Sequence, residues 1–274
     1  MNRRVLPGFG LTLGLTVLYL SLVVILPIGA LLLKASQLSL ADIAHLLSDA
    51  RTLHALKVSF FAAFLSAVIN GIVGFLIAWV LARYSFFGKK LLEIFLDVPF
   101  ALPTAVAGIA LTATYAPNGP IGLFLSKMNI YPAFHFTGIV LALTFVGFPF
   151  VVRTLEPVLK EFEKEQEEAA HCLGANAYQT FLRVIFPYCL PAWMTGMTLA
   201  FARALGEYGS VVFISANIPM KTEIAPFLIM IKLEQYDYNG AIAIAVILLV
   251  MSMLFLLLMN LLQFWKDRHH VQLK

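Results

Sequence analysis

The chain has 274 residues, of which 61% are hydrophobic and 12% are charged, and its formal net charge is +4. A soluble domain carries about 25% charged residues, so a wholly water-exposed globular protein is excluded and most of the surface has to face a bilayer. The basic residues are scattered without aromatic residues between them, which excludes a nucleic-acid surface.

Six stretches of 19 to 29 residues contain no Asp, Glu, Lys or Arg. A membrane-spanning helix needs about 20 apolar residues, and the alternating segments of a membrane β-barrel are missing. The sequence therefore predicts an all-α polytopic membrane protein, with a single transmembrane domain over 1–274. The expected spans are 5–33, 58–82, 98–126, 128–152, 184–202 and 238–265. The first is too long for a signal-peptide core, so we expect it to be retained.

Orientation follows from the basic residues. With the amino terminus in the cytoplasm, the inside segments hold twelve Lys and Arg residues and the outside segments hold six, while Arg203 is counted with the fifth span. Cytoplasmic loops carry the excess of positive charge. Both termini are therefore expected on the cytoplasmic side.

Prolines interrupt the third stretch. Pro99 and Pro103 precede Thr104, and proline leaves backbone carbonyls without a helical partner. Broken helices often line the substrate path of transporters, which makes Pro103 and Thr104 candidates for a translocation path; a packing kink explains them equally well. In the second stretch, Asn70 and Gly71 favour a helix–helix contact over a ligand site.

Residues 156–190 concentrate charge on the predicted cytoplasmic side. Apolar spacings near three and four predict a surface helix from Pro157, Gly174 ends it in a left-handed turn, and a second amphipathic stretch runs from Asn176 to Pro187. The apolar positions are Leu159, Phe162, Ala169, Ala170 and Leu173 in the first helix and Tyr178, Phe181, Leu182 and Ile185 in the second. The opposite face carries acids, which anionic lipid repels. A docking surface for a cytoplasmic partner is therefore favoured over an interfacial anchor.

The chain shows no enzymatic machinery of its own. It lacks a GxxxxGK[ST] phosphate loop, its two cysteines have no CxxC partner, and its one close histidine pair, His269 and His270, lies in a polar tail. We expect no metal site and no bound cofactor. Only Arg203 and Glu207 are ionised within the spans, so a transporter or channel subunit is favoured over an intramembrane enzyme.

Arg203 and Glu207 are four residues apart and share a helix face, near the middle of the bilayer if the fifth span is centred there. An arginine at that depth has to face protein or a water-filled path. Either Arg203 lends positive potential to a path for a dianion, with Glu207 setting its position, or the two form a structural ion pair at a subunit interface. The outside segment 208–240 is either a docking face for an external partner or a solvated loop.

The cytoplasmic segment resembles the EAA loop of ABC importer permeases, and the matching residues are Glu168, Ala169, Ala170, Gly174, Val184, Phe186 and Pro187. The family has Ile and Leu where this chain has Val184 and Phe186, and both replacements keep an apolar contact. In that family the short helix inserts into a groove of the ATP-hydrolysing subunit. The coupling residues that the resemblance implies are Glu168, Ala169, Ala170, Gly174 and Pro187.

Beyond this loop, most of the chain from the second span onward resembles the CysT-type permeases of bacterial sulfate/thiosulfate importers. The resemblance is carried by 97–111, 149–159, 202–219, 221–229 and 232–246. It implies a type I ABC importer permease in the inner membrane, paired with a homologous W-type permease. It also implies a dimer of ATP-binding subunits that uses ATP and Mg²⁺, and a periplasmic sulfate-binding protein. The alternatives are a molybdate or tungstate permease, and a membrane scaffold or channel that needs no ATPase.

Overall fold

The computed structural model describes residues 9–39 and 48–271, with side chains up to residue 263. Within these ranges the ordered elements are all helical, which confirms the all-α prediction. The prediction for His269 and His270 lies outside the described side chains. The elements are α1 (Phe9–Leu20), the π-helix η1 (Ser21–Ile25), α2 (Leu26–Ala35), α4 (Ala50–Arg83), α5 (Lys89–Ala101), α6 (Thr104–Tyr115), α7 (Pro120–Ser126), α8 (Phe136–Glu161), α9 (Lys164–Cys172), α10 (Ala177–Thr180), the π-helix η2 (Phe181–Ile185), α11 (Phe186–Leu205), α12 (Val211–Ile214), α13 (Ala225–Glu234) and α14 (Tyr238–Val271).

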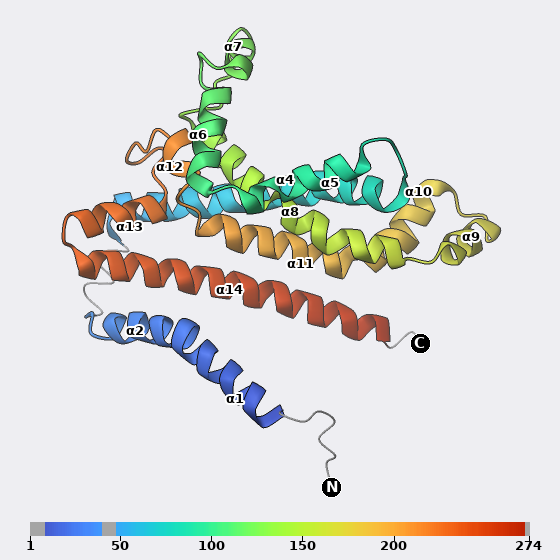
Figure 1. Cartoon of the computed structure of the whole chain (residues 1–274), viewed down its shortest axis with the longest axis horizontal. Helices are drawn as coiled ribbons and strands as arrows, with labels where there is room; N and C mark the ends of the chain where they lie inside the picture. The colour runs from blue at the N-terminus through green and yellow to red at the C-terminus, as the bar shows by residue number, and fades with distance from the viewer. Residues whose placement is uncertain (1–8, 40–47, 272–274) are drawn as a thin grey trace.

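The described residues contain five helices long and apolar enough to cross a membrane, and the bent pair α5–α6 makes a sixth. The five are Phe9–Ala35, Ala50–Arg83, Phe136–Glu161, Ala177–Leu205 and Tyr238–Gln263. Figure 1 shows α4, α8, α11 and α14 running along the long axis, whereas α6 and α7 project away from them. The C-terminal end of α14 lies toward the same end of the molecule as α9, as a cytoplasmic C-terminus requires.

The third span, expected at 98–126 with an interruption at its prolines, is a broken helix. α5 and α6 meet at an angle of 114°, and between them Leu102 is extended while Pro103 precedes the first turn of α6. A residue before proline avoids the helical region, and proline has no N–H to donate. The helix therefore cannot continue through Pro103, although Pro99 is accommodated inside α5.

The fourth span, expected at 128–152, is α8, which begins later and extends further toward the cytoplasmic end. Its last turns contain charged residues that lie beyond the end of the expected span. Arg153 bonds Asp97 of α5 at 2.6 and 3.0 Å, and Lys160 bonds the buried Glu156 at 2.6 Å. Paired charges cost less to hold near a membrane than isolated ones, so the helix continues past the apolar run.

The core is built from α4, α8 and α11, which pack along their lengths. A Cβ on Gly196 of α11 would lie 2.8 Å from Val151 Cα of α8, so only glycine allows the two backbones to approach this closely. Trp193 donates its indole N–H to the carbonyl of Gly71 at 2.8 Å, and Asn70 is fully buried. The predicted helix–helix contact at Asn70 and Gly71 is confirmed.

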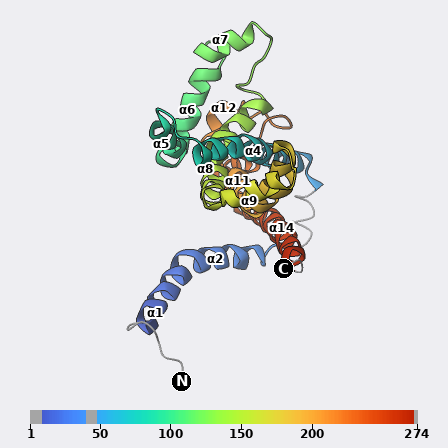
Figure 2. The ribbon, with the colours of Figure 1, turned by 90° about the vertical axis from the view of Figure 1, so that its right-hand side faces the viewer.

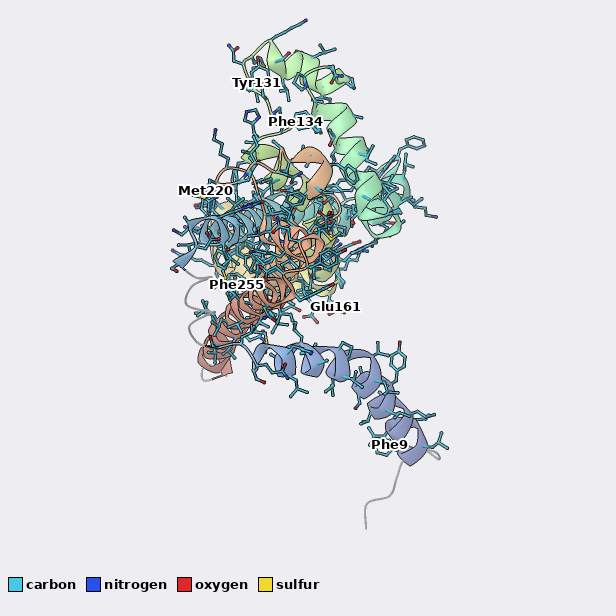
Figure 3. All side chains as sticks on the ribbon, turned by 90° about the vertical axis from the view of Figure 1, so that its left-hand side faces the viewer. Phe9, Tyr131, Phe134, Glu161, Met220 and Phe255 are labelled. Atoms are coloured by element: carbon cyan, nitrogen blue, oxygen red, sulfur yellow. The ribbon has the colours of Figure 1, made fainter. Side chains whose placement is uncertain are left out.

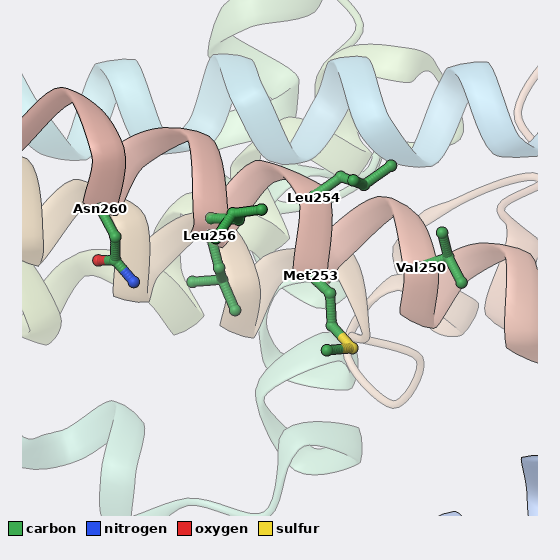
Figure 4. A pocket seen from close by; sticks show the side chains of 6 residues that line it. Val250, Met253, Leu254, Leu256 and Asn260 are labelled. Carbon is green, nitrogen blue, oxygen red and sulfur yellow. The ribbon is translucent and has the colours of Figure 1, made fainter.

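The two terminal spans are the least enclosed. None of α1 or α2 is buried, and α1 stands away from the other helices in Figure 2, with Phe9 at its far end in Figure 3. α14 carries an open apolar groove of about 470 Å³ on its outer face (Figure 4). The groove is lined by Val250, Met253, Leu254, Leu256, Leu257 and Asn260. Such surfaces suit contact with hydrocarbon or with another apolar helix.

Asp49 caps the first turn of α4, accepting hydrogen bonds from the backbone N–H of Thr52 at 3.0 Å and from its hydroxyl at 2.7 Å. The bond from the Thr52 hydroxyl holds the pKa of Asp49 below its ordinary value. A carboxyl with a lowered folded pKa stabilises the fold above its unfolded pKa of about 3.9, and this contribution is lost as pH falls through the folded pKa.

We expect Asp49→Ala to lower the free energy of unfolding by about 1 kcal/mol at pH 7, whereas Asp49→Asn, which keeps a capping oxygen, stays close to the wild type. Below about pH 4 the difference between Asp49→Ala and the wild type should shrink. Thermal unfolding in detergent at the two pH values checks both statements. Equal melting temperatures for the wild type and Asp49→Ala at pH 7 would contradict the cap.

Candidate functional site

α9 is a short surface helix joined to α10 by a sharp turn (Figure 1). Gly174 adopts φ +84°, the left-handed conformation expected of it, and its N–H donates to the carbonyl of His171 at 2.9 Å. Asn176 then caps α10, since its side chain accepts from the N–H of Gln179 at 2.9 Å and the Gln179 side chain accepts from the N–H of Asn176 at 3.0 Å. The predicted left-handed turn at Gly174 is confirmed, whereas the bounds of the two helices beside it differ from those expected.

The two faces of α9 have different surroundings. Glu168 and Ala169 are exposed, whereas Glu167 and Ala170 are half-buried against the bundle. Leu173 was expected to share one apolar face with Leu159 and Phe162, but those two are buried and Leu173 is 89% exposed. The open surface therefore combines a carboxylate, a small residue and an apolar side chain, which suits the groove of a protein partner better than water.

The first cytoplasmic helix does not begin at Pro157, because that residue lies inside α8. Leu159 and Phe162 pack in the lower part of the bundle, in a cluster with Phe75 and Leu155. The chain leaves the helical conformation at Phe162, and α9 starts after it. The apolar pattern therefore ran across two helices, and only its first part, in α8 and at Phe162, lies in the core; α9 has no buried residue.

The second cytoplasmic helix is not separated from the fifth span. α10, η2 and α11 form one helix of 29 residues, Ala177–Leu205. Pro187 lies half-buried in the first turn of α11, just after the π-helical turn η2. In that wider turn the backbone tolerates the absence of an N–H donor at Pro187. Pro187 is therefore part of the span and not of the exposed surface of α9. Tyr178 and Leu182, which were expected on the apolar face of the second helix, are exposed.

Arg203 and Glu207 form an ion pair, with Nη1 and Oε2 2.6 Å apart. The other carboxylate oxygen of Glu207 accepts from the N–H of Ser210 at 2.9 Å and from its hydroxyl at 3.1 Å. Glu207 is only 2% exposed, whereas the Arg203 side chain is 38% exposed. Arg203 lies in the last turn of α11 and Glu207 beyond its end, so the expected position in the middle of the span is wrong.

The broken third span packs on the residues that follow this ion pair, Gly209 and Ser210. A Cβ on Gly209 would collide with the hydroxyl of Thr104, and one on Gly108 would collide with the backbone of Ser210. The first turns of α6 thus lie directly against the segment that Glu207 holds. Thr104 therefore lies beside Gly209, two residues after Glu207, and the neighbouring Pro103 is exposed.

The outside segment 208–240 is not a loosely solvated loop. Its first half is packed: Glu223 is 1% exposed and forms two bonds with Arg51 of α4, at 2.6 and 2.8 Å. The N–H of Ala225 donates to the Ser59 hydroxyl at 2.8 Å. Two parts of it are exposed, the turn at 218–221 and the part around Tyr236 between α13 and α14.

Sequence reasoning missed the long-range charge pairs Arg51–Glu223, Arg83–Glu167 and Arg153–Asp97, since their partners are far apart in the chain. The Glu156–Lys160 pair, at i and i+4, was detectable from spacing. Among the residues that the structure describes, no three His, Cys, Asp or Glu side chains are grouped so as to hold a metal ion.

The fold is shared with solved ABC importers. The chain superimposes on a bacterial ABC transporter involved in the import of the acidic polysaccharide alginate with a TM-score of 0.76 at 15% identity, covering 93% of this chain and 95% of that one. The MetNI methionine ABC transporter gives a TM-score of 0.57 at 16% identity, covering 84% of this chain and 99% of that one. At these identities the likeness establishes the fold alone.

The model of the family described as "Binding-protein-dependent transport system inner membrane component" matches residues 70–269, so the chain belongs to this family of multi-pass ABC importer permeases. It is 51% identical to the probable sulfate transport system permease protein cysT of Nephroselmis olivacea, over 91% of this chain and 88% of that one. It is 44% identical to the sulfate transport system permease protein CysT of Salmonella typhimurium, over 96% of this chain and 95% of that one. These identities place it in the CysT branch of the family.

Membership defines the role of the chain in general terms. It is a permease component of the inner membrane and not the catalytic subunit, as expected from the missing phosphate loop. As a component of a binding-protein-dependent ABC transport system, it works together with an ATPase and a binding protein.

Proposed function

We propose that this chain is the membrane-spanning permease of an ATP-driven importer of sulfate and thiosulfate. The observation that carries the proposal is the similarity to CysT relatives over nearly the whole chain, at identities far above those of the alginate and methionine importers. The proposed anion path at Arg203 and Glu207 and the proposed coupling helix α9 both lie within residues 70–269, which the family model matches.

The complete importer contains a second, W-type permease, two copies of an ATPase that binds ATP and Mg²⁺, and a periplasmic sulfate-binding protein. α9 docks on the ATPase through Glu168 and Ala169, which are exposed, and Ala170, which lies at the edge of the same surface. Gly174 holds the turn that sets the angle of α9. Pro187 acts indirectly, by shaping the start of α11.

The translocation path runs past the half-exposed guanidinium of Arg203. Glu207 accepts three hydrogen bonds from Arg203 and Ser210, which fix its carboxylate and thereby the position of Arg203. The N–H groups of Arg203 that Glu207 does not use are available to a dianion. Pro103 and Thr104 bring the bent third span against the residues that follow Glu207 and form one wall of the path.

Arg203→Leu is expected to raise the KM for sulfate or lower the uptake rate by about tenfold, because a charge-assisted hydrogen bond contributes about 1.5–3 kcal/mol. Arg203→Lys keeps the charge and should lose less. Uptake in proteoliposomes at several sulfate concentrations measures both. If Arg203→Leu transports like the wild type, the residue serves only as a structural ion pair.

The proposed function is tested by radiolabelled sulfate uptake in cells that lack their own importer and express the whole system. We expect energy-dependent uptake that excess thiosulfate blocks strongly. Molybdate transport at low concentration with negligible sulfate uptake would keep the coupling mechanism but assign a different substrate. A reconstituted complex without stimulated ATPase activity would instead indicate a scaffold or channel.

A further inference from the structure

A charge pair ties α9 to a transmembrane helix that is not its neighbour in sequence. Arg83, the last residue of α4, places Nη2 at 2.5 Å from Oε1 of Glu167, in the middle of α9. The side chains are only 15% and 25% exposed. The contact is a charge pair between a guanidinium and a carboxylate. Charge pairs are less directional than hydrogen bonds and persist when one helix tilts against the other.

Aromatic rings hold the guanidinium in place. Its carbon lies 5.1 Å from the ring centre of Trp79, one turn earlier on α4, and 5.5 Å from that of Phe162, at the break between α8 and α9. Phe162 is itself buried in the cluster formed by the inner ends of α4, α8 and α11. Cation–π contacts with two rings strengthen as water is excluded, so Arg83 has a fixed position from which to attract Glu167.

The geometry separates two functions on adjacent residues of α9. Glu168 and Ala169 are exposed on the outer surface, whereas Glu167 is turned inward to Arg83. The chain itself links α9 to α8 and to α10. The Arg83–Glu167 pair adds a third attachment, to α4, which packs along α8 and α11 and leads into the bent span α5–α6.

We propose that the Arg83–Glu167 pair is a positioning contact that transmits movement of α9 to α4. The proposal rests on the proposed role of α9 as the helix that docks on the ATPase, and adds the route by which its movement enters the membrane domain. Without the pair, α9 still docks, but its displacement reaches α4 only indirectly.

The test uses the complete importer in proteoliposomes, with its ATPase and binding protein. Arg83→Gln, Glu167→Gln and the double variant are compared with Glu161→Gln, which removes an exposed carboxylate at the end of α8 and serves as the matched control. Three quantities are measured: the ATPase that co-purifies, ATP hydrolysis stimulated by the binding protein, and sulfate taken up per ATP hydrolysed.

We expect each single variant to keep its ATPase subunits but to lower uptake per ATP about fivefold, and the double variant to lose no more than either single one, since coupled residues are not additive. Glu167→Asp keeps the charge and should recover part of the loss. Arg83→Lys should recover less, because lysine lacks the planar group that stacks between the rings.

Uptake per ATP equal to that of Glu161→Gln would overturn the proposal, and so would a double variant whose loss is the product of the two single losses. If Arg83→Gln does not assemble, Glu167→Gln and Glu167→Asp decide the question, because α9 lies outside the bundle core. A wild-type complex without ATP-driven uptake would overturn the proposed function itself. Normal wild-type uptake that all Glu167 variants retain would overturn the transmission contact alone.

Discussion

Gly174→Val should reduce ATP-driven uptake at least about tenfold and reduce the amount of ATPase that co-purifies. At φ +84° Gly174 has the left-handed conformation, which costs a β-branched residue roughly 1–3 kcal/mol. No atom lies within 4 Å of the place where a Cβ would be, so the effect comes from backbone strain and not from a collision. The turn relaxes by opening, and α9 then meets its partner at the wrong angle.

Gly174→Asn is the matched control, because asparagine tolerates the left-handed region better than other residues with a side chain. It should keep most of the uptake that valine abolishes. Co-purification of the ATPase and uptake are measured on the same preparations. Wild-type values for Gly174→Val in both assays would remove the coupling role of this turn.

Arg51→Met is expected to lower the free energy of unfolding by about 3 kcal/mol. It leaves the Glu223 carboxylate, which is 1% exposed, without its two bonds from Arg51. Breaking a buried pair costs about 3–5 kcal/mol, and the lower figure applies because the Arg51 side chain is 37% exposed. Since this pair holds the outside segment onto α4, the packing between α12 and α13 should loosen first.

Substitution of the other partner, Glu223, should have a smaller effect. Glu223→Gln leaves Arg51 free to regain water and should cost about 1 kcal/mol. Arg51→Met combined with Glu223→Gln should be more stable than Arg51→Met alone. Thermal unfolding in detergent compares them, with Lys232→Met, which breaks a more exposed pair, expected to cost no more than about 1 kcal/mol. Equal melting temperatures for Arg51→Met and Lys232→Met would show that the buried carboxylate needs no partner.

Features that depend on a few neighbouring residues were predictable from the sequence. The charge-free runs specify spans because a helix in lipid has to satisfy its own backbone bonds. The turn at Gly174 and the cap at Asn176 were predictable for a similar reason, since each acts on backbone groups within about one turn. The EAA pattern then indicated which short helix to propose as the coupling surface.

The break of the third span was only half predictable. Pro103 marked the position of the break, but the sequence left a broken helix and a packing kink equally open and gave no sign that the chain turns by 114°. The end of α8 was misplaced because its charged residues were taken to stop the span. Partners on other helices, such as Asp97, make those charges tolerable, and they become visible only once the chain is folded.

The sequence by itself thus determined the membrane class, the number of spans, and the cytoplasmic helix and turn, since these follow from hydrophobicity and from local backbone preferences. Only the tertiary structure decided which face of α9 is open, that Thr104 packs on Gly209, and that Arg83 pairs with Glu167. The physical reason is that burial and charge pairing depend on helices brought together from distant parts of the chain. No local pattern records such neighbours.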